Sequence, residues 1–371
     1  MDPGAPLRSG QDDGVFPHSI CTGRHRAEPD GEHAMLKMIG QRLMTTIPSI
    51  IGVIIVTFLL TRVLPGDTAA YFAGPAASPQ AIAEIRGKLG LDQPLPVQFV
   101  SYVTALLKGD LGQSLTTGQP VTRDIAARLP ASAELTLVGL LLAMAVALPL
   151  GVLAAVKQGS WVDHLCRIVA TAGVSLPVFF TGLLLVYVFY FLLGWSPAPL
   201  GRLDVFASEP PGVTGFLLID MLLARDLEGF RAAFSQLILP AVTLAIFSLA
   251  PITRMTRASM LAVLGADFVR TARASGLTNS KVIGTYAFRN AMLPVVTTLG
   301  MVFSFLLGAN VLVEKVFAWP GIGSYAVEAL IASDYAPIQG FVLTMAVMYV
   351  ALNLMIDVLY GVIDPRVRLE G

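Results

Sequence analysis

Long apolar runs without any charged side chain dominate the pattern of this chain. Six stretches of at least about 18 residues contain no Asp, Glu, Lys or Arg. They are Leu43–Thr61, Leu135–Val156, Ile168–Gly201, Ala232–Thr253, Asn290–Val313 and Tyr335–Ile356. A helix needs about 20 apolar residues to cross the hydrocarbon layer of a bilayer. The pattern therefore predicts an all-α membrane protein with six transmembrane helices.

The third run, Ile168–Gly201, is longer than a single crossing needs and could hold two spans. It ends in Trp195-Ser196-Pro197-Ala198-Pro199, which combines an interfacial aromatic residue with helix-breaking prolines. We therefore expect one span near Val169–Leu193, followed by a loop. Pro177 and Pro240 are expected to break the third and fourth spans.

Lysine and arginine are unevenly distributed between the segments that connect the runs. If the N-terminus is cytoplasmic, the inner segments hold fifteen of these residues and the outer segments hold ten. Six of the ten lie in the first outer loop, and loops of about 60 residues or more count little in the positive-inside rule. Both the N and C termini are therefore predicted to be cytoplasmic.

The composition disfavours several classes of protein. Hydrophobic residues make up 55% of the 371 residues and charged residues only 13%, about half the share usual in soluble proteins. The formal net charge is zero, which disfavours a protein that binds nucleic acid. Two cysteines, Cys21 and Cys166, are too few for a disulfide framework, and no metal site is expected.

Three regions are expected along the chain. Residues 1–34 are polar and rich in Gly, Pro and Asp, so we expect a disordered N-terminal extension, and translation could begin at Met35. Residues 35–131 would hold the first transmembrane helix and a folded outer-face segment. Residues 132–371 would form the core domain, with five transmembrane helices and a cytoplasmic loop at 254–290.

Two outer segments carry structural signals. In the first, Ser78-Pro79 can start a helix that Gly90 ends, and Val97–Leu107 has apolar residues at helical spacing. In the third, Phe317–Gly323 contains a Pro-Gly turn flanked by aromatic residues. This turn is either re-entrant and lines a cavity, or an ordinary turn beside an interfacial Trp. The candidates for a pore or gate are Trp319, Pro320, Gly321, Gly323 and the uncharged polar Asn310.

The inner segment from Arg254 to Arg289 contains a candidate docking helix. Arg270 and Arg273 are three residues apart and share one helical face. Small side chains nearby would let the backbone of a partner approach closely, and Gly276 suits the end of the helix. The segment is either a docking element for another protein or a basic helix that faces lipid. Its candidate residues are Asp267, Arg270, Ala272, Arg273, Ala274 and Gly276.

Several kinds of chemistry have no residues to support them. The sequence has no Gly-x-x-x-x-Gly-Lys-Ser/Thr phosphate loop, so a partner must supply any ATP site. The runs hold no acidic residue or histidine, which argues against ion-coupled transport. An intramembrane enzyme is a remote alternative, because all four histidines lie outside the runs and no base is available to activate a nucleophile there.

From Met35 to Arg368 the chain resembles the permease subunits of the dipeptide/oligopeptide/nickel ABC importer family. The resemblance rests on several short motifs in the same order and at similar spacing. They are Leu64–Asp67, Leu89–Gln98, Gly109–Ser114, Asp267–Gly276, Phe317–Gly323, Asp334–Gly340 and Asp364–Arg368. The Asp267–Gly276 motif resembles the loop that bacterial importer permeases use to contact their ATPases.

The resemblance implies a B-type permease subunit with the type I ABC importer fold, in the inner (plasma) membrane of a bacterium. Its implied partners are a second homologous permease, two cytoplasmic ATPase subunits that bind ATP and Mg, an extracytoplasmic substrate-binding protein and membrane lipid. The implied cargo is short peptides, with nickel or another small solute as the alternative. The chain itself would be a transport subunit with no cofactor of its own and not an enzyme.

The ATPase-contacting loop lacks two features of the general importer pattern, an acidic residue at the start and a proline at the end. Arg270-Thr271-Ala272 stands where that pattern has Glu-Ala-Ala, and Tyr286–Arg289 stands where it ends in proline. This resembles the variant carried by one of the two non-identical permeases of peptide importers. The departure therefore favours a heterodimeric pore.

Overall fold

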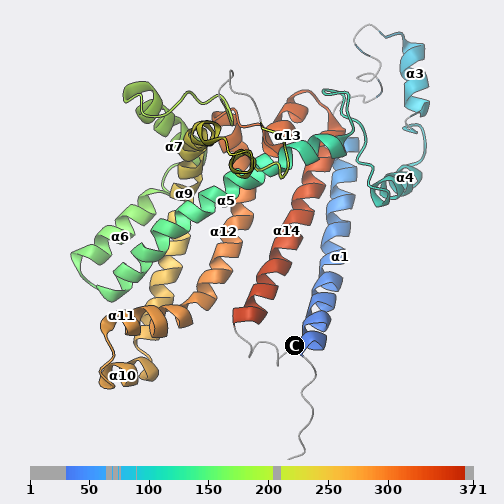
Figure 1. The fold of residues 1–371 in the computed structure, drawn as a ribbon. Coiled ribbons are helices and arrows are strands. Elements are labelled where there is room, and N and C mark those ends of the chain that lie inside the picture. Colours follow the sequence, from blue (N-terminus) through green and yellow to red (C-terminus); the bar gives the residue numbers. More distant parts are fainter. Residues whose placement is uncertain are drawn as a thin grey trace, which may run out of the picture.

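The computed structural model describes residues 31–63, 69, 74, 77–88, 90–203 and 210–363 of the chain, and these residues are mainly helical (Figure 1). The long helices are α1 (Gly31–Val63), α5 (Val121–Val156), α9 (Leu227–Leu264), α12 (Arg289–Val316) and α14 (Tyr335–Ile363). The short ones are α3 (Pro79–Lys88), α4 (Leu95–Leu107), α6 (Trp161–Ala172), α7 (Val178–Leu185), α8 (Leu217–Leu223), α10 (Asp267–Ala274), α11 (Asn279–Lys281) and α13 (Ile322–Ile331). Two π-helices, η1 (Val186–Leu192) and η2 (Val282–Phe288), complete the set.

Within the described residues, four helical stretches are long and apolar enough to cross a membrane. They are Val121–Val156, Leu227–Leu264, Asn279–Val316 and Tyr335–Ile356, and they contain the second, fourth, fifth and sixth apolar runs. The first and third runs correspond to Met44–Leu59 and Val178–Leu192, which are apolar but shorter. The structure therefore shows a helical protein with several candidate spans, and the count of six stays a prediction.

The third span differs from the single helix expected near Val169–Leu193. Helix α6 ends at Ala172, and α7 begins at Val178 after Pro177, so the expected break at this proline is confirmed. A Cβ atom on Gly173 would lie 2.5 Å from the carbonyl oxygen of Ile246, so the chain turns here in direct contact with α9.

The expected break at Pro240 is wrong. Pro240 is buried inside α9, which runs uninterrupted from Leu227 to Leu264. A proline removes one backbone hydrogen bond from a helix, and close packing along α5 supports the helix at this position.

Helices α5 and α9 form the centre of the bundle, and α12 packs beside them. Their contact is close because glycines of α5 face side chains of α9. A Cβ atom on Gly139 would lie 2.9 Å from that of Leu244, and one on Gly151 would lie 2.5 Å from that of Thr256. Small residues permit this spacing between helices in a membrane. The main apolar core therefore lies between α5, α9 and α12.

The predicted helices of the first outer segment are confirmed. Helix α3 begins after Ser78, whose Oγ accepts a hydrogen bond from the N–H of Ala81 at 3.2 Å, and Gly90 follows its end with φ of +65°. Helix α4 corresponds to the predicted Val97–Leu107 helix. Helix α5 begins at Val121, inside the region assigned to this segment, and the boundary at residue 131 stays a prediction.

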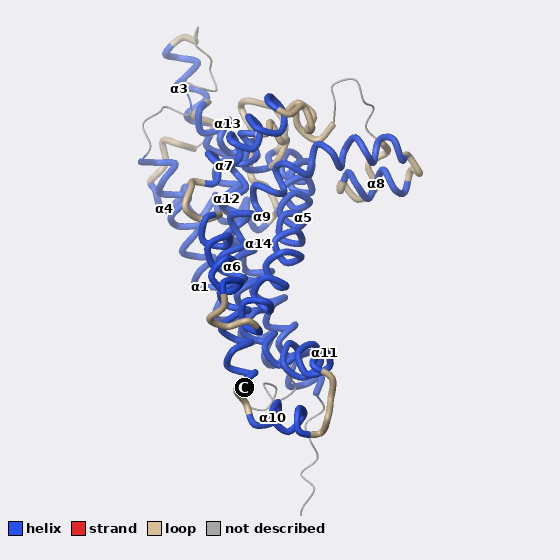
Figure 2. Tube along the Cα trace, turned by 90° about the vertical axis from the view of Figure 1, so that its left-hand side faces the viewer, coloured by secondary structure: helices blue, strands red, loops and turns tan. Residues whose placement is uncertain are grey.

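The two ends of the bundle are distinct (Figures 1 and 2). Helices α10 and α11 lie beyond one end, together with the N-terminal end of α1 and the C-terminal end of α14, whereas α3 and α13 lie at the other. Helix α1 begins at Gly31, so residues 31–34 are helical and not part of a disordered extension as predicted. The rest of that extension, residues 1–30, and the motifs Leu64–Asp67 and Asp364–Arg368 lie outside the described residues.

Candidate functional site

Helix α10 and Gly276, here called the α10 segment, form an exposed element beyond one end of the bundle (Figure 2). The side chains of Asp267, Arg270 and Arg273 are exposed on its outer face, and Ala274 and Gly276 are also exposed. An ion pair joins Asp267 to Arg270 at 3.4 Å, and a pair this exposed contributes little to stability. The predicted charged face is therefore present and free of other described contacts at its charged groups.

The end of α10 depends on a left-handed residue. Gly276 has φ of +74°, where a side chain is strained, and open space surrounds the position that a Cβ atom would take. The predicted helix end at Gly276 is confirmed. Thr278 stands at the N-cap of α11, although its side chain makes no capping hydrogen bond.

The inner face of α10 packs against its own subunit. Val269 and Ala272 are buried with Val282, and Leu264 and Leu277 pack around them. Ala272 therefore lies on the side turned away from the exposed face, unlike the other five candidates, and a contact of any of the six with an ATPase stays a prediction. This packing ties the α10 segment to the end of α9 and the start of η2.

A continuous helical stretch leads from this segment into the bundle. Residues 279–316 pass from α11 through η2 into α12 without interruption. The π-helical turn of η2 is an uncommon feature that recurs at functional sites in helices. Val269 and Ala272 of α10 pack against Val282 of η2, so a displacement of α10 would be passed to this stretch through that contact.

An ion pair braces the same end of the bundle. Arg257 of α9 donates two hydrogen bonds to Asp163 of α6, at 2.8 Å and 2.7 Å. Asp163 also accepts a hydrogen bond from the N–H of Gly159 at 3.0 Å. The side chain of Asp163 is only 3% exposed, and the Arg257 guanidinium holds the pKa of its carboxyl well below the ordinary value. Sequence reasoning missed this pair, although both residues lie within five positions of an apolar run.

The opposite end of the bundle contains a buried polar cluster around Ser132, Asn310 and Glu314. The Ser132 hydroxyl donates to a carboxylate oxygen of Glu314. The Asn310 amide donates to the same oxygen at 3.0 Å, to the Ser132 carbonyl at 3.2 Å and to Thr136 at 3.1 Å. All of these side chains are almost fully buried, so the cluster joins α5 to α12 in a place without water to replace lost bonds.

The Trp-Pro-Gly turn between α12 and α13 is hydrogen-bonded to this cluster and to the adjoining turn of α5. The indole N–H of Trp319 donates to the carbonyl of Ala131 at 2.9 Å, and the N–H of Ile322 donates to Ser132 at 2.9 Å. The N–H of Ser324 donates to the second carboxylate oxygen of Glu314 at 2.8 Å.

Glycine is required where this turn meets Glu314. A Cβ atom on Gly321 would overlap the Glu314 carboxylate, and one on Gly323 would lie 2.9 Å from it. The structure buries four of the five predicted pore or gate residues, and Pro320 is the exposed one. Their burial places them inside the polar cluster at this end of the bundle, and their role in a pore or gate stays a prediction.

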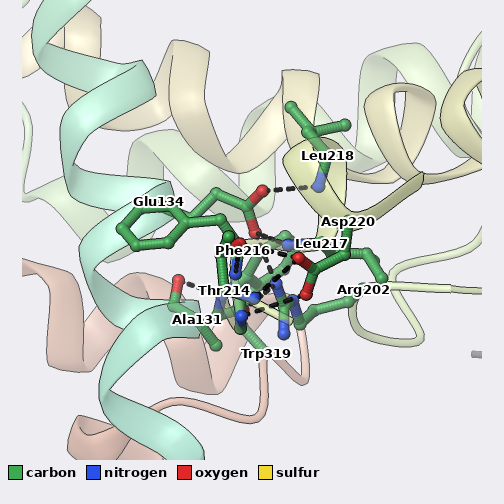
Figure 3. A network of polar contacts seen from close by, with 10 residues as sticks. Ala131, Glu134, Arg202, Thr214, Phe216, Leu217, Leu218, Asp220 and Trp319 are labelled. Atoms are coloured by element: carbon green, nitrogen blue, oxygen red, sulfur yellow. Dashed lines mark hydrogen bonds and ion pairs between the residues drawn. The ribbon is translucent and has the colours of Figure 1, made fainter. Parts of the chain in front are cut away.

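A second outer segment is attached to the same turn of α5 (Figure 3). Glu134 pairs with Arg202 and accepts hydrogen bonds from the N–H groups of Leu217 at 3.2 Å and Leu218 at 2.8 Å. Arg202 also donates to the carbonyl of Gly215 at 3.1 Å. Residues 131–136 therefore hold both outer segments, and we call this stretch the α5 hub.

A buried aspartate joins the first outer segment to the junction of α13 and α14. One carboxylate oxygen of Asp334 accepts hydrogen bonds from the Ser114 hydroxyl at 2.8 Å and from the N–H groups of Leu115 at 2.6 Å and Thr116 at 3.0 Å. Sequence reasoning noted Asp334 only as part of a motif. Its hydrogen-bond partners lie more than 200 positions away in the sequence, so local patterns could not indicate its role.

Comparison with known proteins identifies the architecture. A family described as the inner membrane component of binding-protein-dependent transport systems matches residues 147–369. The N-terminal region of such membrane components matches residues 35–136. The chain belongs to this family. It is therefore a multi-pass membrane protein and a permease component of an ABC importer, which is a transport subunit and not an enzyme by itself.

Curated relatives cover nearly the whole permease. The probable D,D-dipeptide transport system permease DdpB of Escherichia coli is 44% identical over 90% of this chain and 98% of its own length. The di/tripeptide permease DppB of Pseudomonas aeruginosa is 43% identical over 90% and 99%. The dipeptide permease DppB of Escherichia coli is 42% identical over 90% and 99%. The α10 segment and the Trp-Pro-Gly turn both lie inside the matched part of this permease.

Proposed function

We propose that this permease forms half of the translocation path for short peptides in a type I ABC importer of a bacterial inner membrane. The three relatives above are named for dipeptide, D,D-dipeptide and di/tripeptide transport, which supports peptides as the cargo. A second homologous permease would complete the path as a heterodimer. An extracytoplasmic binding protein would deliver the substrate, and nickel or another small solute is the alternative cargo.

The proposed topology has six crossings with both chain ends in the cytoplasm. The bundle supports it because the N-terminal end of α1 and the C-terminal end of α14 lie at the same end as α10 (Figure 1). This end would be cytoplasmic, so the α10 segment would meet the ATPase subunits there. ATP and Mg would be bound by those subunits and not by this chain.

The observation that carries the mechanism is the two-sided character of α10. Its outer face presents exposed charged groups, while Val269 and Ala272 fix its inner face to α9 and η2. A docked ATPase could therefore grip the outer face, and its motion would pass to α9 and α12 as a rigid-body shift. At the far end, α12 carries Asn310 and Glu314. The same shift would therefore act on the hydrogen bonds that join these residues to the α5 hub.

Gly276→Asp tests this coupling in the assembled transporter, reconstituted in liposomes with its ATPases, second permease and binding protein. The expected result is normal insertion and ATP hydrolysis with loss of dipeptide uptake, because the variant places strain and charge at the end of the docking helix. Gly265→Asp is the matched control. It adds the same charge at the C-cap of α9, two residues before α10, at φ of −83° and with no contact closer than 3.6 Å, and it should retain uptake.

Full dipeptide uptake by Gly276→Asp would refute the docking role. Uptake of nickel instead of dipeptide by the unmodified complex would refute peptides as the cargo. It would not contradict the proposed coupling through α10. The two measurements therefore separate what the permease carries from how it is driven.

A further inference from the structure

Helix α4 is unusual among the outer-face elements because it carries no charged residue. Its sequence from Leu95 to Leu107 contains only apolar residues, Gln, Ser, Thr, Tyr and one Pro. Val97, Val100 and Leu107 are 46%, 63% and 84% exposed and follow one another at helical spacing on one face. Ser101 and Thr104 complete this face, and the Thr104 hydroxyl bonds to the carbonyl of Val100 at 2.7 Å. A helix face in water normally carries charged side chains, and this one has none.

The opposite face of α4 fixes its position on α1. The rings of Phe99 and Tyr102 pack against Phe58 of α1, with centroids 5.2 Å and 5.8 Å apart. At its start, the Gln98 amide donates to the carbonyls of Leu91 at 3.1 Å and Gln93 at 2.7 Å. The exposed apolar face is therefore held in one direction, away from α1.

The level of Phe58 along α1 sets the depth of α4. The apolar run of α1 ends at Thr61, and Arg62 follows it. At about 1.5 Å per residue, Phe58 lies about 6 Å before that first charge. This is the depth at which interfacial helices bury an apolar face, about 5–10 Å into the boundary between headgroups and acyl chains.

The surface beside α4 on α1 is also apolar. Ile55, Val56 and Leu59, which adjoin Phe58 in α1, are each at least 40% exposed. Figures 1 and 2 place α4 at the periphery of the bundle, beside α1 and away from α9. The free face of α4 therefore extends the lipid-facing surface that a membrane-crossing α1 presents.

Helix α3 of the same outer segment provides a contrast. It holds Glu84, Arg86 and Lys88 within ten residues and lies farther from the bundle than α4 (Figure 1). Charged and uncharged helices thus follow each other in one short segment. This arrangement separates a helix suited to water from a helix suited to lipid.

We propose that α4 is an interfacial helix whose Val97, Val100 and Leu107 side chains contact the acyl chains of the leaflet that holds the C-terminal end of α1. The lipid anchors the first outer segment at the membrane surface, next to the bundle. This inference rests on α1 crossing the bilayer, as in the proposed topology, but not on the cargo or on the coupling to ATPases.

Site-directed spin labelling of the full chain in liposomes tests the proposal. Cys21 and Cys166 are replaced by Ser and Ala, and one nitroxide is attached at Val100→Cys. Collisions with oxygen, which partitions into lipid, are compared with collisions with a water-soluble nickel chelate. Ala83→Cys, on an exposed position of α3, is the aqueous control, and Ile55→Cys is the lipid-facing control on α1.

The label at Val100→Cys should have an oxygen-to-chelate collision ratio several-fold above that of Ala83→Cys and close to that of Ile55→Cys. A ratio like that of Ala83→Cys would overturn the proposal, because α4 would then lie in water. Low collision rates with both reagents would also overturn it, since protein would cover the face. A water-exposed Ile55→Cys would overturn the placement of α1 and the inference with it, whereas dipeptide uptake is measured separately.

Discussion

Replacing Arg257 by Met should destabilise the chain by removing the partner of a buried carboxylate. Asp163 keeps its charge in a place where its side chain is only 3% exposed because Arg257 donates two hydrogen bonds to it. Methionine retains most of the apolar stem of arginine, so the variant tests the charge and its bonds more than the packing.

The expected loss in the free energy of unfolding is about 2–3 kcal/mol. Breaking a fully buried ion pair by removing one partner costs roughly 3–5 kcal/mol. Here the loss is smaller, because Arg257 is 23% exposed and two weaker partners of Asp163 remain. These are the N–H of Gly159 and the guanidinium of Arg167 at 3.6 Å.

The reverse change should cost less. Asp163→Asn leaves the Arg257 guanidinium without its carboxylate, but that group reaches solvent, so a loss of about 1 kcal/mol is expected. The double variant should be less destabilised than the sum of the two single variants, since neither charge is then left buried alone. The relative size of the losses in Arg257→Met, Asp163→Asn and the double variant is a more specific test than the size of any single loss.

The measurement is equilibrium unfolding of the purified chain in detergent between pH 7 and pH 3. The pKa of Asp163 is lowered in the folded state, so the stability that it contributes is fully present above the ordinary aspartate pKa of about 3.9 and is lost as the pH falls below it. The difference between wild type and Arg257→Met should shrink over the same range. Equal losses for Arg257→Met and Asp163→Asn, or strictly additive losses in the double variant, would refute the reasoning.

Two further predictions concern close approaches. Gly321→Ala should destabilise the chain by about 1–3 kcal/mol, because its methyl group would overlap the Glu314 carboxylate, whereas Gly212→Ala, in open space, should change little in the same unfolding assay. Gly151→Val should separate α5 from α9 and lower the thermal stability by a similar amount, and Gly52→Val on the exposed side of α1 is its control. Wild-type stability of either buried variant would show that the contact is looser than described.

The apolar pattern allowed most helices to be predicted, because a charge-free run of about 20 residues has few alternatives to a helix in lipid. The α10 segment and the helices of the first outer segment were also predictable, since small residues, prolines and glycines mark their ends locally. The lengths of α5 and α9 were not, because both continue past their apolar runs through polar residues such as Asp124 and Arg254.

The polar clusters could not be predicted from local patterns. Glu134 and Arg202 are separated by 68 positions, and Ser132 and Glu314 by 182. Only the packing of α5 against other elements brings such residues together. Glu134 directly precedes the second apolar run and Glu314 directly follows the fifth, and these positions were the available signals.

The uninterrupted passage from η2 into α12 has a mechanical consequence. Helix α12 holds 28 residues, which corresponds to a rod about 42 Å long. If its end beside α10 acts as the pivot, a swing of about 0.1 radian carries the far tip sideways by about 4 Å. At Asn310 and Glu314 the same swing gives about 3–4 Å, which is comparable to the lengths of their hydrogen bonds to α5. A small displacement at the α10 end of α12 would thus be enough to strain the hydrogen bonds that join its other end to α5.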